Sequence, residues 1–388
     1  MNKYILIFIF SLLFINTLTS EPTAQQANPE DSILFWDREQ KINGFRDGYK
    51  FVPSRIIKKS TNPYPLDYQL LDFSDVTYRY RNKSYSLEDY IDKFNVAGLL
   101  ILRRGNVLFE NYNFGNDEDS KWISFSVTKS ITSMLVGAAI EDGFIEDIND
   151  TVIKYLPDLS GSNYDEISIK HVLQMSSGIE WNEDYDDPYS DVNLAAGLNS
   201  LDLYKYLYKL DKTNKPSRKF NYNTAESNLL GGVVRSAVGS NLSNYLESKI
   251  WQSFGMESDA YWGLDNTFLD ELGGCCIYAT LKDYARVGIF ALNQGKLLNG
   301  DKVLPENWME DSTKASSANQ YYGYQWWLGG RRYESFAAQG IFGQLIWIDP
   351  PTETVVVMQS AWDKAWTLEA EQHKYALLTS IMVKLYNL

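Results

Sequence analysis

Histidine is almost absent from this chain of 388 residues, which contains only His171 and His373. A zinc site or a Ser-His-Asp triad would have to be built from these two side chains, so the sequence disfavours both kinds of centre. His171 follows Lys170 within a helical pattern, and His373 lies in a predicted C-terminal helix. We interpret both histidines as structural or surface residues.

Cysteine is equally scarce, because Cys275 and Cys276 are the only two and are adjacent. Neighbouring cysteines cannot form an ordinary bridge without straining the local backbone. We therefore expect two small, buried side chains that follow Gly273 and Gly274.

Positive charge and low-complexity sequence are also in short supply. The 36 Lys and Arg residues face 50 Asp and Glu residues, which gives a formal charge of -14 and disfavours nucleic acid as a partner. With 44% hydrophobic residues and no internal repeat, the composition is that of a globular protein. The chain lacks a Gly-x-Ser-x-Gly turn, a phosphate-binding loop and a dinucleotide-binding fingerprint, so we expect neither an α/β-hydrolase nor a bound cofactor.

The N-terminus has the pattern of an export signal. A short basic start, Met1 to Lys3, precedes the apolar run Tyr4 to Phe14, and cleavage near Ser20 would remove residues 1–20. A retained membrane anchor would need roughly 20 apolar residues, which this stretch does not supply. We therefore expect an exported protein, periplasmic or extracellular, without a stable membrane anchor after cleavage.

Hydrophobic periodicity predicts an α+β architecture. Apolar runs at 96–102 and 107–114 indicate a hairpin, and four short runs between 326 and 359 indicate further strands. Helical periods cover 126–142, several segments between 167 and 254, and 370–386. Residues 21–85, with their prolines, are expected to be an irregular N-terminal extension. The main domain would span 86–388, with an antiparallel sheet flanked by helices (about 86–120 and 275–388) and an all-helical lobe (about 121–274).

The sequence Ser126-Val127-Thr128-Lys129 lies where the first of these helices begins. Residues three apart share a helix face, so the Ser126 hydroxyl can meet the Lys129 amine, and burial near the positive end of the helix would lower the pKa of that amine. A neutral Lys129 can act as a base toward Ser126. The alternative is a capping serine followed by a solvated lysine.

Two further segments follow in a specific order. Tyr222 precedes the predicted helix 226–238, and the Gly-containing segment 337–343 precedes the predicted strand 344–348. Together with Ser-x-x-Lys, this order resembles that of class C β-lactamase-like serine hydrolases, in particular the 6-aminohexanoate-dimer hydrolase and carboxylesterase branch. The resemblance covers roughly residues 85 to 385, including the segments 124–130, 175–178 and 283–286.

The resemblance implies a β-lactamase/transpeptidase-like fold with a Ser126 nucleophile, a Lys129 base and a Tyr222 phenol that shuttles the proton to the leaving group. A neighbouring ammonium would have to lower the pKa of Tyr222 for that role. The oxyanion hole would consist of the backbone N–H groups of Ser126 and Ile341. Thr224 replaces the asparagine of many relatives, and its hydroxyl could still hold Lys129.

The third motif departs from that of β-lactamases. Where they carry Lys-Thr-Gly or His-Thr-Gly, this chain has Ala338-Gln339-Gly340, which lacks the side chains that bind a substrate carboxylate. We therefore predict an exported serine hydrolase that cleaves a small-molecule ester or short amide through an acyl-enzyme. The alternatives are a β-lactamase or D-Ala-D-Ala peptidase, and a catalytically silent protein that binds ligands in a Trp- and Tyr-rich cleft.

The acidic loop between Asn182 and Asp191 is a weaker candidate site. Its carboxylates, Glu183, Asp184, Asp186, Asp187 and Asp191, could bind calcium or a cationic substrate. The loop lacks the turn glycine and the closing glutamate of an EF-hand, so a solvated loop is the better interpretation and no metal site is expected. We expect Tyr185 to line the substrate cleft with Thr224, Gln339 and Gly340.

Overall fold

The structure is a computed structural model that describes residues 32–265, 267, 269–329 and 334–387. The expected signal segment, residues 1–20, lies outside the described residues. No helix within the described part of the chain is both long and apolar enough to cross a membrane.

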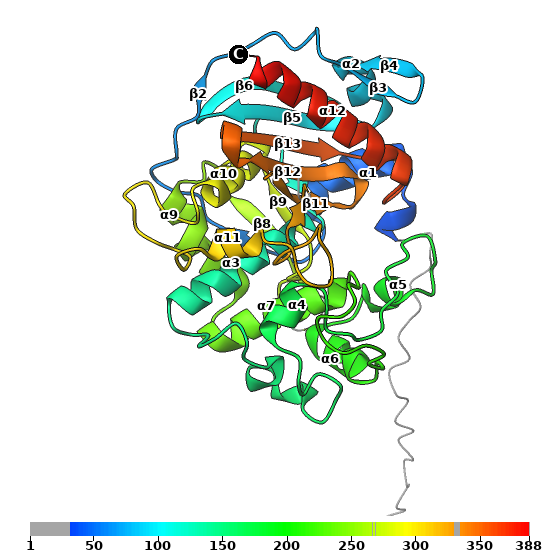
Figure 1. Cartoon of the computed structure of the whole chain (residues 1–388), viewed down its shortest axis with the longest axis vertical. Helices are drawn as coiled ribbons and strands as arrows, with labels where there is room; N and C mark the ends of the chain where they lie inside the picture. The colour runs from blue at the N-terminus through cyan, green and yellow to red at the C-terminus, as the bar shows by residue number, and fades with distance from the viewer. Residues whose placement is uncertain (1–31, 266, 268, 330–333, 388) are drawn as a thin grey trace, which may run out of the picture.

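The main sheet combines strands from both ends of the chain, as the sequence predicts (Figure 1). Its seven strands are, in spatial order, β10 (Trp327–Leu328), β11 (Phe336–Gly340), β12 (Gln344–Asp349), β13 (Thr354–Ser360), β5 (Val96–Arg103), β6 (Asn106–Tyr112) and β2 (Asp67–Tyr68). Neighbours are antiparallel except β2 and β6, which are parallel. The predicted α+β architecture is confirmed, with a mixed rather than purely antiparallel sheet.

Helices cover both faces of this sheet. Alternate residues of β5 belong to different cores, because Leu99 and Ile101 pack with α12 (Leu368–Tyr386) whereas Leu100 and Leu102 pack with α10 (Leu281–Leu292). The α12 face also carries α1 (Arg38–Asp47), α2 (Leu87–Lys93) and the hairpin of β3 (Thr77–Tyr80) and β4 (Lys83–Ser86).

The helical part lies below the sheet in the view of Figure 1. It contains α3 (Val127–Glu141), α4 (Ile169–Leu173), α5 (Asp191–Ala195), α6 (Ser200–Tyr208), α7 (Thr224–Val238), α8 (Leu242–Leu246), a π-helical turn (Glu247–Trp251) and α9 (Gln252–Phe254); α11 (Trp308–Ser312) follows α10. Short 3-10 turns occupy Ile33–Phe35, Gly48–Lys50, Val152–Lys154, Pro157–Leu159, Ile341–Gly343 and Pro350–Thr352. The α3 helix is buried along most of its length against α7 and β11.

A second, four-stranded sheet connects the two parts. Its order is β1 (Ser54–Ile57), β8 (Ala260–Gly263), β9 (Ile277–Ala279) and β7 (Trp122–Ile123). The N-terminal segment that we expected to be irregular therefore contains α1 and the strands β1 to β4. These strands are two to four residues long, which is too short for a periodic signal, and β1 and β2 pair with distant strands.

The prediction for the cysteines is wrong, because Cys275 and Cys276 form a disulfide. The pair lies in the turn before β9, and Cys276 has a φ of 80°. The turn thus already has an unusual backbone conformation in which adjacent sulfur atoms can meet.

Candidate active site

The start of α3 brings Ser126 and Lys129 together. The Lys129 Nζ lies 3.0 Å from the Ser126 Oγ, and Lys129 is only 1% exposed. The Ser126 side chain makes no capping hydrogen bond at the helix start. The alternative of a capping serine with a solvated lysine therefore does not describe this helix.

Lys129 has three hydrogen-bond partners, one for each position around its nitrogen that the bond to the side-chain carbon leaves open. Besides the Ser126 Oγ, the Nζ lies 3.0 Å from the Thr224 Oγ1 and 3.0 Å from the Gly274 carbonyl oxygen. The carbonyl can only accept, and Thr224 donates its own proton to Glu183. A neutral Lys129 thus directs its two N–H groups to Thr224 and Gly274 and its lone pair to Ser126. The expected contact between Thr224 and Lys129 is present.

Burial also favours the neutral form of this amine. Desolvation lowers the pKa of Lys129 from its usual 10.5 to about 8, and the charge of Glu183 opposes that shift. At pH 7 about one-tenth of the molecules therefore carry the free base, a much larger fraction than for an exposed lysine.

Tyr222 lies beside this pair. The Tyr222 ring stacks on that of Trp327, with the two centroids 5.7 Å apart. The Lys129 Nζ lies 5.2 Å from the centroid of the Tyr222 ring. Burial and the charge of Glu183 raise the pKa of the phenol well above its usual value, although a hydrogen bond with Ser126 acts in the opposite direction. The expected lowering of this pKa by an ammonium is wrong, because desolvation outweighs it. Tyr222 is therefore a neutral hydroxyl.

The strand β11 approaches the nucleophile segment very closely. A Cβ atom on Gly340 would lie 2.5 Å from the Ser124 carbonyl oxygen and 3.1 Å from the Phe125 Cβ, so only glycine fits there. The contact places Ile341 next to Ser126, and among the described residues no hydrogen-bond partner engages either backbone N–H. These two groups are available as an oxyanion hole.

The acidic loop contributes one residue that sequence reasoning missed. The Glu183 carboxylate accepts hydrogen bonds from the Thr224 backbone N–H at 3.0 Å, from the Tyr185 hydroxyl at 2.8 Å, and from the Thr224 hydroxyl and the Trp181 indole. It therefore orients Thr224 and adds negative charge beside Lys129. The position of Trp181 two residues before Glu183 was the only sequence signal for this role.

The other carboxylates of the loop bond backbone groups of the loop or side chains just outside it, since Asp186 pairs with Lys364 and Asp191 accepts from the Tyr206 hydroxyl. Asp184 accepts from the Asp186 N–H, Asp187 from the Tyr189 N–H, and Asp191 from the Asn182 N–H. Across the described ranges no group of three or more His, Cys, Asp and Glu residues is arranged to hold a metal ion.

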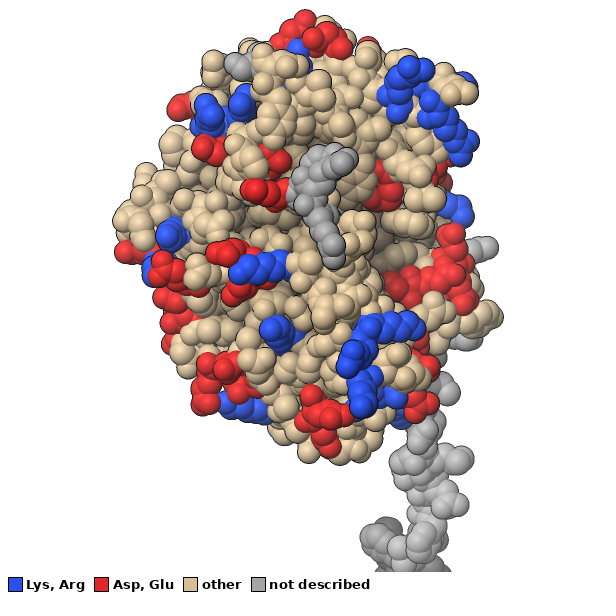
Figure 2. Space-filling view, viewed as in Figure 1, with Lys and Arg blue, Asp and Glu red and all other residues tan. Residues whose placement is uncertain are grey.

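A cleft of about 1410 Å³ extends from Ser126 to α12. Of the site residues predicted from the sequence, Ser126, Tyr185, Tyr222, Gln339, Gly340 and Ile341 line it, whereas Lys129 and Thr224 do not. Other walls are aromatic and aliphatic, and its charged residues within the described part of the chain are all acidic: Glu183, Asp184, Asp186, Asp349 and Glu371. Acidic side chains also border the hollow visible on the face in Figure 2.

A buried lysine from α12 lies behind the third motif. The Lys374 Nζ donates to the Gln339 Oε1 at 2.6 Å and pairs with Glu371 at 2.8 Å, and its side chain is 2% exposed. The Gln339 amide also donates to the Tyr375 hydroxyl. Glu371 therefore balances the charge of Lys374, which is not free to bind a substrate carboxylate.

Both histidines have structural contacts. The His171 Nδ1 accepts from the Ser168 N–H at the start of α4, and the His373 Nδ1 shares a buried hydrogen bond with the Tyr78 hydroxyl. Neither residue lines the cleft.

The chain matches known proteins over most of its length. Residues 87–379 match the Beta-lactamase family. The chain is 30% identical over 319 residues to a 6-aminohexanoate-dimer hydrolase of Paenarthrobacter ureafaciens, an alignment that covers 76% of this chain and 79% of that protein. A putative 6-aminohexanoate-dimer hydrolase from Bacillus anthracis is similar in structure, with a TM-score of 0.81, 22% identity and coverage of 91% and 96% of the two chains. EstCE1, a hydrolase with promiscuous acyltransferase activity, has a TM-score of 0.58 at 16% identity, with coverage of 76% and 96% of the two chains.

Proposed function

This chain belongs to the β-lactamase family, and from that premise we propose that it is a serine hydrolase that cleaves an ester or short amide through an acyl-enzyme on Ser126. The observation that carries the proposal is the environment of Lys129. A buried amine whose N–H groups are both held by acceptors, and whose remaining direction faces a hydroxyl 3.0 Å away, is arranged as a base.

Acylation would begin when Lys129 takes the proton of Ser126 as the Oγ attacks the substrate carbonyl carbon. The negative charge that develops on the carbonyl oxygen would be held by the N–H groups of Ser126 and Ile341. Tyr222, a neutral hydroxyl in the cleft wall, would give its proton to the leaving alcohol or amine and recover one from the Lys129 ammonium. Water would then hydrolyse the acyl-enzyme by the same steps in reverse order.

The charges of the cleft favour an uncharged substrate. The charged side chains that a substrate carboxylate would meet in the described lining are all acidic, although Asp186 is paired with Lys364 and Glu371 with Lys374, the cation behind Gln339. The aromatic and aliphatic walls suit an apolar acyl or alkyl chain. The related protein named as a 6-aminohexanoate-dimer hydrolase supports a linear amide as a second substrate class.

Export is part of the proposal. The apolar run Tyr4 to Phe14 has the pattern of a removable signal, and the disulfide of Cys275 and Cys276 is typical of an oxidising compartment. We propose a periplasmic or extracellular enzyme that acts on small molecules.

Intact-mass analysis after treatment with a fluorophosphonate tests the nucleophile. We expect one adduct on the wild type, located at Ser126, and none on Ser126→Ala. The variant should remain folded, since this side chain makes no capping bond, and should lose ester turnover. Equal turnover by a folded Ser126→Ala protein would refute the mechanism, and an unlabelled, inactive wild type would favour a silent binding protein.

A further inference from the structure

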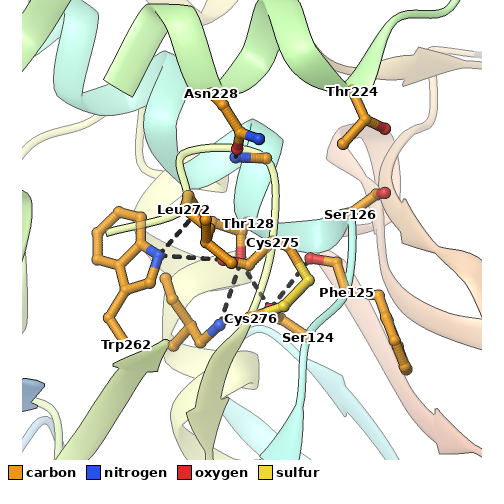
Figure 3. The surroundings of a disulfide bond; sticks show 12 residues. Ser124, Phe125, Ser126, Thr128, Thr224, Asn228, Trp262, Leu272, Cys275 and Cys276 are labelled. Atoms are coloured by element: carbon orange, nitrogen blue, oxygen red, sulfur yellow. Dashed lines mark hydrogen bonds between the residues drawn. A yellow bond between two sulfur atoms is a disulfide. The ribbon is translucent and has the colours of Figure 1, made fainter. Parts of the chain in front are cut away.

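The disulfide of Cys275 and Cys276 lies directly beside the proposed catalytic centre. Figure 3 shows it between the Ser126 segment and the Trp262 side chain. The Trp262 indole donates to the carbonyls of Leu272 and Cys275, each at 3.0 Å. Both cysteines are partly exposed.

The residue before the disulfide contacts the proposed base. The Gly274 carbonyl accepts the hydrogen bond from the Lys129 Nζ, and the Gly274 N–H donates to the Asn228 side chain at 2.8 Å. A Cβ atom on Gly274 would lie 3.0 Å from the Thr224 carbonyl oxygen, so this turn is packed tightly against α7.

The residue after the disulfide contacts the nucleophile segment. The Ile277 carbonyl accepts from the Ser124 N–H at 2.7 Å, and the Ile277 N–H donates to the Ser124 Oγ at 2.9 Å. The two cysteines therefore join the carbonyl that orients Lys129 to the strand that holds the segment leading to Ser126.

We propose that the Cys275–Cys276 disulfide is a positioning element of the catalytic centre, which holds the Gly274 carbonyl against Lys129 so that the lone pair of the amine faces Ser126. The inference rests on the proposed function. The Sγ–Sγ bond closes a small ring that includes the peptide bond between the two residues, and that ring restricts the backbone dihedral angles on both sides. Cys276 has a positive φ, and the ring acts together with two backbone hydrogen bonds of the turn, from the Cys275 N–H to the Leu272 carbonyl at 3.0 Å and from the Gly263 N–H to the Cys276 carbonyl at 2.8 Å.

Reduction is the perturbation that tests this role. A dithiol breaks the Sγ–Sγ bond by transferring two electrons and two protons to the sulfur atoms, and is itself oxidised to a disulfide. The released turn lets the Gly274 carbonyl leave Lys129. We expect kcat on nitrophenyl butyrate to fall about tenfold with little change in KM, because the base loses its orientation while the cleft walls stay in place.

The pH profile separates positioning from general damage. A carbonyl acceptor favours the ammonium over the neutral amine, so its loss should move the rising limb of the pH–rate profile to lower pH. We would compare the oxidised wild type, the wild type reduced by a dithiol, and the Cys275→Ala/Cys276→Ala variant. Iodoacetamide labelling and intact mass report the thiol state, and a thermal melt reports folding.

We expect reduction to cause a reversible loss of kcat and to move the rising limb of the pH–rate profile to lower pH. The double variant should behave like the reduced wild type and should not respond to the dithiol. Full kcat in a wild type with two verified free thiols would overturn the inference. So would a loss of kcat with the limb unmoved or shifted to higher pH. Fluorophosphonate labelling of the oxidised wild type tests the proposed function separately, so failure of one does not imply failure of the other. If the double variant does not fold, the reduced wild type decides.

Discussion

Replacing Glu183 by glutamine should change the pH dependence of the enzyme. The carboxylate accepts the proton of Thr224, whose oxygen is 3.0 Å from the Lys129 Nζ, so its charge acts across one hydroxyl. That charge raises the pKa of Lys129 against the effect of burial and also raises the pKa of Tyr222. Its removal therefore favours the neutral amine at lower pH.

Coulomb's law sets the size of the effect. Two unit charges about 5 Å apart interact by roughly 3 kcal/mol at an effective dielectric constant of about 20. Because Glu183 is only partly buried, solvent screens this interaction, and we expect the rising limb of kcat/KM to move down by about one pH unit from its wild-type position near 8. The maximal rate should also fall, because the glutamine NH2 would take the place of Oε1 and donate to the Thr224 hydroxyl, which then no longer directs its own proton away from Lys129.

The assay is nitrophenyl butyrate hydrolysis between roughly pH 6 and 10, corrected for spontaneous hydrolysis of the ester. Asp187→Asn is the matched control, because it removes the same charge from the same loop while its side-chain oxygen still accepts from the Tyr189 N–H. Its limb should coincide with that of the wild type. A Glu183→Gln limb that stays in place or moves to higher pH would refute the assignment of Lys129 as a neutral base.

Three further predictions concern the same cleft. Lys129→Arg should be nearly inactive at every usable pH, because a guanidinium stays protonated, and a wild-type rate would reduce Lys129 to a positioning charge. Gly340→Ala should lower kcat by about 100-fold or more while the protein still folds, because the new methyl group would press on the Ser124 carbonyl oxygen and displace the Ile341 N–H; unchanged kcat would exclude that oxyanion donor. Nitrophenyl butyrate should have a higher specificity constant than nitrocefin, because Gln339 offers no free cation; the reverse order would favour a β-lactamase.

The contact between Ser126 and Lys129, the proposed nucleophile and base, could be predicted from sequence because it is local. Residues at positions i and i+3 share a helix face wherever the helix forms, and the apolar period after Ser126 predicts that helix. The sheet could be predicted for a related reason, since continuous apolar runs such as 96–102 indicate strands buried on both faces. The predicted roles of Tyr222 and Ile341, in contrast, depended on the order of motifs within a known family.

Only the tertiary structure decided the protonation and orientation of these side chains. Lys129 receives its two acceptors from residues 95 and 145 positions away, and no local pattern reports such distances. The same holds for Glu183, whose loop resembles a solvated acidic segment until folding brings it to α7, and for the disulfide, which needs a turn with positive φ. The direction of the Tyr222 pKa was predicted wrongly because desolvation depends on every atom packed around the phenol. Sequence determined which chemical groups are present and their local spacing, whereas burial and long-range contacts decided their protonation and orientation.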